Sequence, residues 1–499
     1  MLVPAFSEIA RFVADTMGQF DGVPCTALIS VPAPFAPPTA FLRTQARNMA
    51  FFWDSPGGTA FAGSGAVKTI RVSGDDRLAQ LRQEVDALWG DLRLYAHPEC
   101  RPPAPRVFGG LAFHPGGTNP LWDQFGDGCF TLPRWCYGRR SSRAFVSLAV
   151  RGDTDCSGPR KRHLLAELEN IFQALGTAEE HSALLETPRI EEPRPATLHE
   201  QVDSAQWGDH IEKIRSAIAS GKFQKIVAAR RCKIDLPEQV DALEVLSRLI
   251  VQPMCTRFLF GRENVSFLGA SPETLFDKRG SVLQTEALAG TARCPQGAEP
   301  DAFANELLDS SKDLSEHAFV VDEIARALAP FCDELRSSKR PKVHRIREIL
   351  HLRTPFKGRL NRNVDAISLL EALHPTPAVG GLPTAAAAEW IANHESDARG
   401  WYAGPVGWMD SAGDARFVVA IRCGLVSDDR AHIFTGAGIV RESRAQAEYA
   451  ETALKQLPLL RALGISETSA SQGVTPEPTP PSTRPSRAPL EALRVVEHA

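Results

Sequence analysis

The spacing of apolar residues divides the chain into two parts of different texture. Over residues 1–195, short apolar runs stand between clusters of glycine and proline, as at 49–53, 107–113 and 144–150. Runs of this length with turn residues on either side are typical of β-strands. We therefore expect this part to consist mainly of strands and turns, with a few helices.

After residue 195, helical and strand periods alternate. Trp207, Ile211, Ile214 and Ile218 recur at helical spacing, and the apolar run 223–230 that follows favours a strand. Further strands are predicted at 257–261, 402–408, 417–425 and 432–435, and helices at 305–328, 385–393 and 443–457. Residues 196–463 are therefore predicted to form a mixed α/β region.

The composition changes again over residues 464–499, where Ser, Thr, Pro and Glu predominate. Such a segment buries too little apolar surface to offset the entropy of ordering, so we predict a disordered tail. Its last stretch, 490–496, has amphipathic spacing, but a frayed end is favoured over a docked helix.

Overall composition indicates a globular protein. Of the 499 residues, 43% are hydrophobic and 23% charged, and the net charge of -4 gives no general attraction for nucleic acid or an acidic membrane. The ten cysteines contain no CxxC pair, which argues against a zinc ribbon or a disulfide scaffold. The N-terminus lacks the pattern of a signal peptide, and no apolar run approaches ~20 residues, so we expect a cytoplasmic protein.

Lys225 is a candidate general base. Strand alternation within 223–230 places it on the same face as Phe223 and Val227. Burial among apolar residues disfavours the charged form of a lysine, and a lysine of lowered pKa can accept a proton. A lysine that reaches solvent from an edge strand explains the pattern equally well.

Two other charged residues stand next to apolar runs. Glu273 follows the run 267–270, where a raised pKa would make it a proton donor. Arg422 interrupts 417–425, which we predict to be one strand covered on both faces, so its guanidinium must meet an anion there. That anion is either a ligand carboxylate or an internal acidic side chain.

The segment 436–455 combines glycines with a charged helix face. Gly436 and Gly438 predict a turn that frees backbone N–H groups, and Ser443 with Gln446 has the spacing of a capping box. The following helix face carries Glu448, Glu451 and Lys455.

Glu316 offers a third carboxylate. It shares a helix face with Phe319 and Val320, so it needs a cation or a hydrogen-bond donor. Together with Glu451 it could complete an oxygen-ligand Mg²⁺ site. Solvated helix faces and internal salt bridges are the competing interpretations.

Two glycine-containing motifs predict tight loops in which backbone can approach a ligand. They are Gly290–Thr291 and Gly380–Gly381. Neither matches a phosphate loop or a dinucleotide fingerprint, so nucleotide binding has no motif support.

Taken together and in order, these segments resemble the chorismate-utilising enzymes, which include isochorismate synthases, salicylate synthases and the large subunits of anthranilate and aminodeoxychorismate synthases. The resemblance covers about residues 200–460. Its marks are QKIVAAR at 224–230, GASPE at 269–273, EALAGT at 286–291, SKDLSEH at 311–317, HLRTPFKG at 351–358, HPTPAVGG at 374–381, WYAGPVG at 401–407, FVVAIR at 417–422 and GAGIV at 436–440.

The resemblance implies a fold, a substrate and a cofactor. The fold would be a single α/β fold in which residues 1–195 and 196–463 interleave, with large antiparallel sheets packed together and helices outside. The substrate would be chorismate and the cofactor Mg²⁺, with Glu316 and Glu451 as metal ligands and Glu448 bound directly or through water. Carboxylate groups of the substrate would meet Tyr402, Arg422, Gly436, Gly438 and Lys455. The ring would lie near Gly290, Thr291 and Ala378, and His351 would sit close to the reacting hydroxyl.

Within the family, two positions point to isochorismate synthase. Some aminodeoxychorismate synthases place a lysine where this chain has Ala289, and anthranilate synthases usually have threonine where it has Ala378. We therefore expect Lys225 to activate water for attack at C2 and Glu273 to protonate the departing C4 hydroxyl. Because the nucleophile is water, no obligate amidotransferase subunit is expected.

Other functions stay open from sequence. Salicylate synthase and anthranilate synthase component I are the enzyme alternatives, and a silent chorismate-binding scaffold with a Pro-rich tail is the alternative of another class. The motifs fit enzymes of menaquinone, siderophore or salicylate synthesis alike.

Overall fold

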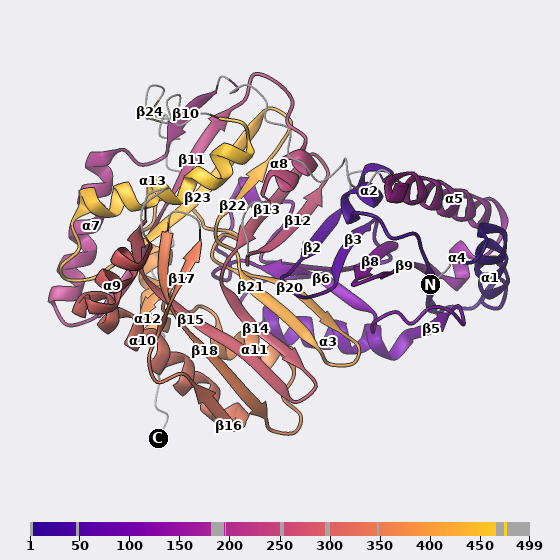
Figure 1. The fold of residues 1–499 in the computed structure, drawn as a ribbon, viewed down its shortest axis with the longest axis horizontal. Coiled ribbons are helices and arrows are strands. Elements are labelled where there is room, and N and C mark those ends of the chain that lie inside the picture. Colours follow the sequence, from indigo (N-terminus) through magenta and orange to yellow (C-terminus); the bar gives the residue numbers. More distant parts are fainter. Residues whose placement is uncertain are drawn as a thin grey trace, which may run out of the picture.

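The computed structural model gathers most strands into two large sheets with helices on their outer faces (Figure 1). It describes residues 3–45, 49–180, 194, 196–249, 254–294, 300–346, 349–465 and 474–476. The predicted tail therefore lies mostly outside the described residues.

The larger sheet has 14 strands and combines strands from both sides of residue 195. Its order is β24 (Val474–Pro476), β10 (Thr197–Glu200), β11 (Lys225–Asp235), β23 (Arg430–Ile439), β22 (Cys423–Val426), β13 (Val265–Ser271), β12 (Thr256–Arg262), β2 (Phe51–Asp54), β3 (Ala60–Ser64), β8 (Trp135–Arg140), β9 (Arg143–Arg151), β1 (Thr26–Pro32) and β5 (Leu92–Ala96), with β19 (Gly381–Leu382) paired to β11. Only the outer pairs β1–β5 and β10–β24 are parallel among the described strands.

The smaller sheet has 10 strands, and its described pairs are antiparallel. The order is β16 (Cys332–Ser337), β18 (Ile349–Leu360), β15 (Val282–Arg293), β14 (Thr274–Arg279), β21 (Ala415–Val419), β20 (Pro405–Asp410), β6 (Arg106–Leu111), β7 (Gly128–Leu132) and β4 (Lys68–Val72), with β17 (Lys342–Ile346) paired to β18. These architectures confirm the predicted fold class.

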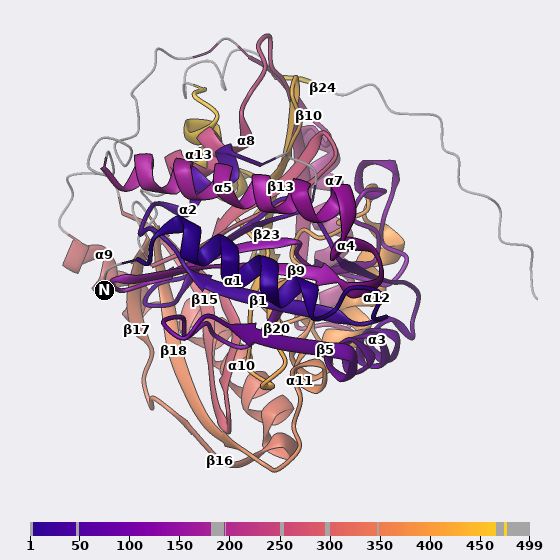
Figure 2. The same cartoon turned by 90° about the vertical axis from the view of Figure 1, so that its right-hand side faces the viewer.

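Helices cover the outer faces of the sheets. Figure 2 shows α1 and α5 lying across the end of the larger sheet that contains β9, β1 and β5. The helices are α1 (Phe6–Gly18), α2 (Pro38–Arg43), α3 (Arg77–Asp91), α4 (Gly152–Asp155), α5 (Gly158–Glu180), α7 (Ser204–Ala219), α8 (Ala242–Arg248), α9 (Pro300–Asp309), α10 (Ser311–Leu328), α11 (Ala366–Leu373), α12 (Thr384–His394) and α13 (Ala445–Ala462).

Strand alternation divides the buried side chains between two main cores. In β12, Phe258 and Phe260 pack between the two sheets, whereas Leu259 points to the opposite face beneath the helices. In β13, Phe267 and Leu268 divide in the same way. Successive side chains of a strand point to opposite faces, so a strand buried on both sides reads as a continuous apolar run.

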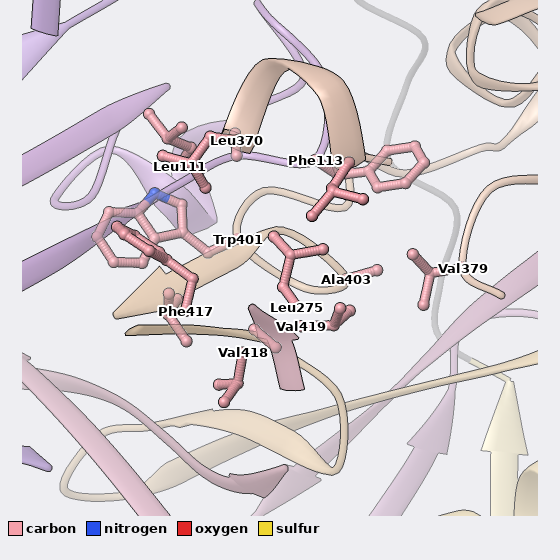
Figure 3. Packing of buried hydrophobic residues seen from close by; sticks show 14 of the residues in the cluster. Leu111, Phe113, Leu275, Leu370, Val379, Trp401, Ala403, Phe417, Val418 and Val419 are labelled. Atoms are coloured by element: carbon pink, nitrogen blue, oxygen red, sulfur yellow. The ribbon is translucent and has the colours of Figure 1, made fainter. Parts of the chain in front are cut away.

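The two sheets are joined by a ribbon that bends from one into the other. β13 pairs with β22 in the larger sheet, and their continuations β14 and β21 pair in the smaller one. At the bend, Glu273 lies between β13 and β14, and Arg422 lies between β21 and β22. Three hydrogen bonds clamp it: Ser271 Oγ donates to Val419 O at 2.6 Å, Val419 N to Glu273 O at 3.1 Å, and Ala270 N to Arg422 O at 3.2 Å. Apolar side chains fill the space beside it, with Leu275, Val418 and Val419 in one cluster (Figure 3).

The bend corrects one sequence prediction. The run 417–425 is not a single strand but β21 and β22, separated by Arg422, whose φ of 52° is a left-handed conformation. Both strands are buried, so the apolar composition continues across the break and conceals it. The predicted strand 402–408 is also displaced: β20 begins at Pro405, and Tyr402 lies in the turn before it.

The glycine predictions were wrong about local structure. Gly436 and Gly438 lie inside β23, opposite Ala229 and Val227 of β11, rather than in a turn. Gly290 lies inside β15, where the pairing with β18 shifts register and its φ is 78°, so the predicted loop is a β-bulge.

Helix boundaries also needed correction. The predicted helix 305–328 is two helices, because Ser310 ends α9 and its hydroxyl caps α10 by accepting a hydrogen bond from Asp313 N. α13 starts at Ala445, and Ser443 Oγ accepts from Val440 N instead of capping the helix. The amphipathic helix around Trp207 is confirmed as α7.

Candidate active site

Glu273 occupies the bend between the sheets and is almost fully buried. Only 5% of the residue is exposed, and Thr376 Oγ1 donates a 3.4 Å hydrogen bond to its Oε1. Burial first, and then the negative charge of Glu286, raises the pKa of Glu273 to about 7. Lys225 and Arg422 lie close enough to oppose that shift. At neutral pH a large fraction of this carboxyl group therefore carries a proton.

Lys225 begins β11 and is 5% exposed. Its Nζ donates to Glu316 Oε1 at 2.6 Å, which joins the strand to α10. Gly438, on the neighbouring strand, makes room for this ion pair. A Cβ at Gly438 would lie 2.6 Å from Lys225 Cε, 3.0 Å from its Nζ and 3.2 Å from Glu316 Oε1.

α13 turns a polar face toward the sheet. Glu448, Thr452 and Gln456 are buried, whereas Ala447 and Ala450 are exposed. This arrangement reverses the usual pattern of a surface helix, in which the apolar stripe is buried. The polar residues of this face therefore have a role other than solvation.

Lys455 ties α13 to β23. Its Nζ donates to Gly436 O at 2.9 Å and pairs with Glu451 Oε1 at 2.6 Å. Gly436 also borders Tyr402, because a Cβ at Gly436 would lie 2.9 Å from the tyrosine Oη. The ring of Tyr402 stacks on Phe434, with ring centroids 5.6 Å apart.

Arg422 lies within electrostatic reach of three other candidate residues. Burial lowers the pKa of its guanidinium, and the charges of Tyr402, Glu451 and Glu273 oppose that effect. Burial likewise raises the pKa of Tyr402. Glu451 and Glu273 thus lie close enough to influence Arg422, and its anion partner stays a prediction.

His351 lies on β18, directly opposite Thr291 of β15. Its Nδ1 is 3.3 Å from Gly290 O, and a carbonyl can only accept, so the contact assigns the imidazole proton to Nδ1. Burial, followed by the charges of Arg422 and Lys455, lowers the pKa of His351 to about 3. The ring is therefore neutral over the physiological range.

Ala378 belongs to the loop that precedes β19. This loop approaches the bend through Thr376, and Arg399 fastens it to β11: Nη1 donates to Val379 O at 2.7 Å and Nη2 to Val227 O at 2.8 Å. Glu395 holds the guanidinium in place with a 2.6 Å contact.

Sequence reasoning had not singled out Thr376, Glu286, Arg399 or Glu395. Their roles arise from contacts between distant segments, so no local pattern distinguishes them. Asp313 was missed as well, although it stands one helical turn before Glu316, and its Cβ is 3.3 Å from the position that a Cβ on Gly290 would take.

The predicted metal site stays a prediction. Within the described ranges, no three His, Cys, Asp or Glu side chains gather closely enough to hold a metal ion. Instead, Glu316 and Glu451 each contact a lysine. Glu316 belongs to α10, and Glu448 and Glu451 belong to α13. The lysine partners of Glu316 and Glu451 lie beside Gly438 and Gly436 of β23, two residues apart.

Comparison with known proteins identifies the family. The family model described as "Chorismate binding enzyme" matches residues 17–464. The chain belongs to this family. In Pseudomonas aeruginosa, the salicylate biosynthesis isochorismate synthase is 35% identical over 440 residues, which cover 85% of this chain and 87% of the relative. An isochorismate synthase of Bacillus subtilis is 38% identical over 266 residues, 51% of this chain and 67% of that protein.

Solved structures support the same relationship. The menaquinone-specific isochorismate synthase of Escherichia coli superposes with a TM-score of 0.72 at 26% identity, covering 92% of this chain and 99% of that one. Anthranilate synthase component I of Streptococcus pneumoniae has a TM-score of 0.61 at 21% identity, covering 85% and 97%, and shares the fold. Among the described residues of this chain, no helix is long and apolar enough to span a membrane.

Proposed function

We propose that this protein is an isochorismate synthase, which converts chorismate to isochorismate. The observation that carries the proposal is the state of Glu273, a buried carboxyl group with a pKa of about 7, beside Lys225. A carboxyl group that keeps its proton near neutral pH can protonate a leaving group. The family and its isochorismate synthase relatives support the same reaction.

In the proposed reaction, Lys225 removes a proton from water as the water oxygen bonds to C2 of chorismate. The double bonds of the ring shift, the bond from C4 to its hydroxyl breaks, and Glu273 gives its proton to that hydroxyl, which leaves as water. One water enters and one departs, so the substrate and product are isomers. A reactive lysine must be neutral, so the Lys225–Glu316 ion pair is a contact that opens before catalysis.

Substrate binding would fall to the groups around the acid and base. Arg422, Lys455 and Tyr402, with the backbone at Gly436 and Gly438, would bind the carboxylates. Gly290, Thr291 and Ala378 would line the ring. His351, held neutral by burial, would contact a hydroxyl group through hydrogen bonding rather than charge.

We also propose Mg²⁺ as the cofactor. The donors fit a hard cation that prefers oxygen, and Glu316, Glu448 and Glu451 would hold it. Glu448 is buried, with 6% of the residue exposed, and Glu316 and Glu451 each contact a lysine. Carboxylates in such positions need positive charge nearby. When bound, Mg²⁺ supplies charge that anchors the substrate carboxylate.

The decisive experiment incubates the purified protein with chorismate and Mg²⁺ and identifies the product by chromatography and mass spectrometry. We expect isochorismate, and we expect Lys225→Ala to lower its formation by ~10²-fold or more. Salicylate with pyruvate would instead identify a salicylate synthase, and anthranilate on addition of ammonia an anthranilate synthase. Heat stabilisation by chorismate without any turnover would indicate a silent binding protein.

A further inference from the structure

A second pocket lies at the ends of β14 and β21 that are farthest from the bend. Its volume is about 720 Å³, and its walls come from the β2–β3 turn, the segment before β6, the β14–β15 hairpin and the β20–β21 hairpin. Glu273 precedes β14, whereas Asp277, four residues along, lines the pocket. At ~3.3 Å per residue the two positions are about 13 Å apart, so this pocket is separate from the candidate active site.

Arginines dominate the polar lining of this second pocket. Four arginines and three aspartates line it, which leaves one positive charge: Arg106, Arg140, Arg279 and Arg416 against Asp277, Asp410 and Asp414. Arg140 is exposed and makes no ion pair with any described residue. The guanidinium fork matches the geometry of carboxylate and phosphate groups.

Arg106 has spare hydrogen-bonding capacity in a buried position. Its side chain is 8% exposed, and its ion pair with Asp410, from Nη2, is 3.4 Å long. Nε and Nη1 are buried without a hydrogen-bond partner. The guanidinium is packed against Trp408, at 3.9 Å from the ring centroid, and against Phe61, at 4.6 Å. These rings fix its orientation and stabilise its charge, but they satisfy none of its donors.

Arg416, which lines the same pocket, is similarly incomplete. Its Nη1 donates to Asp277 Oδ2 at 3.0 Å, while its Nε is buried without a partner. Asp277 also forms an ion pair with Arg279, whose Nε lies 2.8 Å from Oδ1, although Oδ1 accepts no hydrogen bond from the described residues. One carboxylate thus serves two guanidinium groups. Buried donors left without acceptors cost free energy unless a ligand or water supplies them.

We infer that this pocket binds a small molecule carrying two or more oxyanionic groups. Arg140, which has no ion pair among the described residues, and the incompletely bonded Arg106 and Arg416 offer donors at several points of the wall. A single oxyanion would leave some of these donors unmet. The volume lies within the range of small-molecule sites.

Calorimetric titration of the full chain tests this inference with two probes, pyrophosphate for phosphate groups and citrate for carboxylates, at constant ionic strength. We expect saturable binding of at least one probe at one site, and the tighter probe identifies the class of oxyanion. Arg140→Gln and Arg106→Lys should each weaken that binding by ~10-fold or more, the magnitude of one charge-assisted hydrogen bond.

Arg422→Gln is the control for binding at the candidate active site, which also has cationic groups, and should leave the affinity for the probe unchanged. Isochorismate formation by Arg140→Gln should match the wild type and show that the variant is folded. The inference is overturned if neither probe binds, if both pocket variants bind like the wild type, or if Arg422→Gln abolishes binding.

Discussion

Replacing Glu273 by glutamine should stabilise the protein at alkaline pH while removing its activity. The pKa of this carboxyl is about 7 in the folded protein, against an ordinary value of 4.5. At about 1.4 kcal/mol per pH unit, this pKa difference of about 2.5 corresponds to about 3.5 kcal/mol. That free energy is the cost of keeping a buried, ionised Glu273 in the folded state.

The direction of the pH effect on stability follows from which state, folded or unfolded, binds more protons. Below pH 4.5 the carboxyl is protonated in both the folded and unfolded states, so ionisation does not affect stability. Between pH 4.5 and 7 the unfolded state ionises first, and stability falls as pH rises. Above pH 7 the loss is complete. Glutamine has nearly the same shape, never ionises, and can still accept the hydrogen bond from Thr376.

The assay is thermal unfolding of wild type and Glu273→Gln at pH 5 and pH 8. We expect the variant to gain about 2–3 kcal/mol relative to wild type between the two pH values, or roughly 2–3 °C in Tm at ~2.1 cal/mol/K of unfolding entropy per residue. Glu212→Gln is the matched control, because Glu212 is 62% exposed on α7. If Glu273→Gln showed the same small pH dependence as that control, the carboxyl would not be strained by burial and the assignment of the acid would fail.

Further predictions test the same site. Turnover should fall as pH rises through about 7, because Glu273 loses its proton. Glu286→Gln removes a negative charge near Glu273, so it should shift this fall in turnover to lower pH. A pH–rate profile that Glu286→Gln leaves unchanged would contradict the electrostatic coupling between Glu286 and Glu273. Gly438→Ala should displace Lys225 and Glu316 and lower turnover by ~10-fold or more, whereas Gly208→Ala in α7, where nothing lies within 4 Å of the added Cβ, should leave turnover at the wild-type level. Chelation by EDTA should stop isochorismate formation and added Mg²⁺ restore it, while Glu451→Ala should raise the Mg²⁺ concentration needed; turnover that persists in EDTA would remove the metal from the proposal.

The spacing of apolar residues correctly predicted several helices and strands. α7 was predicted because Trp207 and three isoleucines recur at helical spacing, and all four are buried. The apolar runs at 49–53, 107–113 and 144–150 correspond to β2, β6 and β9. Sequence reasoning did not single out α3 or α5, although their buried residues recur at helical spacing: Leu81, Val85 and Leu88 in α3, and Leu164, Leu168, Ile171 and Leu175 in α5.

The assembly of the site could not be deduced from local pattern. Lys225 meets Glu316 across 91 residues of sequence, and Glu273 meets Thr376 across 103. Nothing in either segment indicates its partner, so these residues were grouped only by resemblance to a family. The bend at Arg422 could not be recognised from sequence for a related reason. The strands on either side of it, β21 and β22, are both buried and therefore both apolar, although they belong to different sheets.

α13 shows most clearly how the site determines the local sequence. An ordinary surface helix would bury Ala447 and Ala450 and expose Glu448, Thr452 and Gln456, but α13 does the reverse. Some of these polar groups meet partners: Arg230 Nε donates to Thr452 Oγ1 at 2.7 Å, and Lys455, one turn after Glu451, bonds to β23. Gln456 Nε2, in contrast, is buried without a hydrogen-bond partner among the described residues. Such a helix gains less from apolar burial than its length would allow. Polar groups held firmly in a buried position are what a binding site requires, so the inverted face is an argument for function that rests on α13 alone, independent of any resemblance.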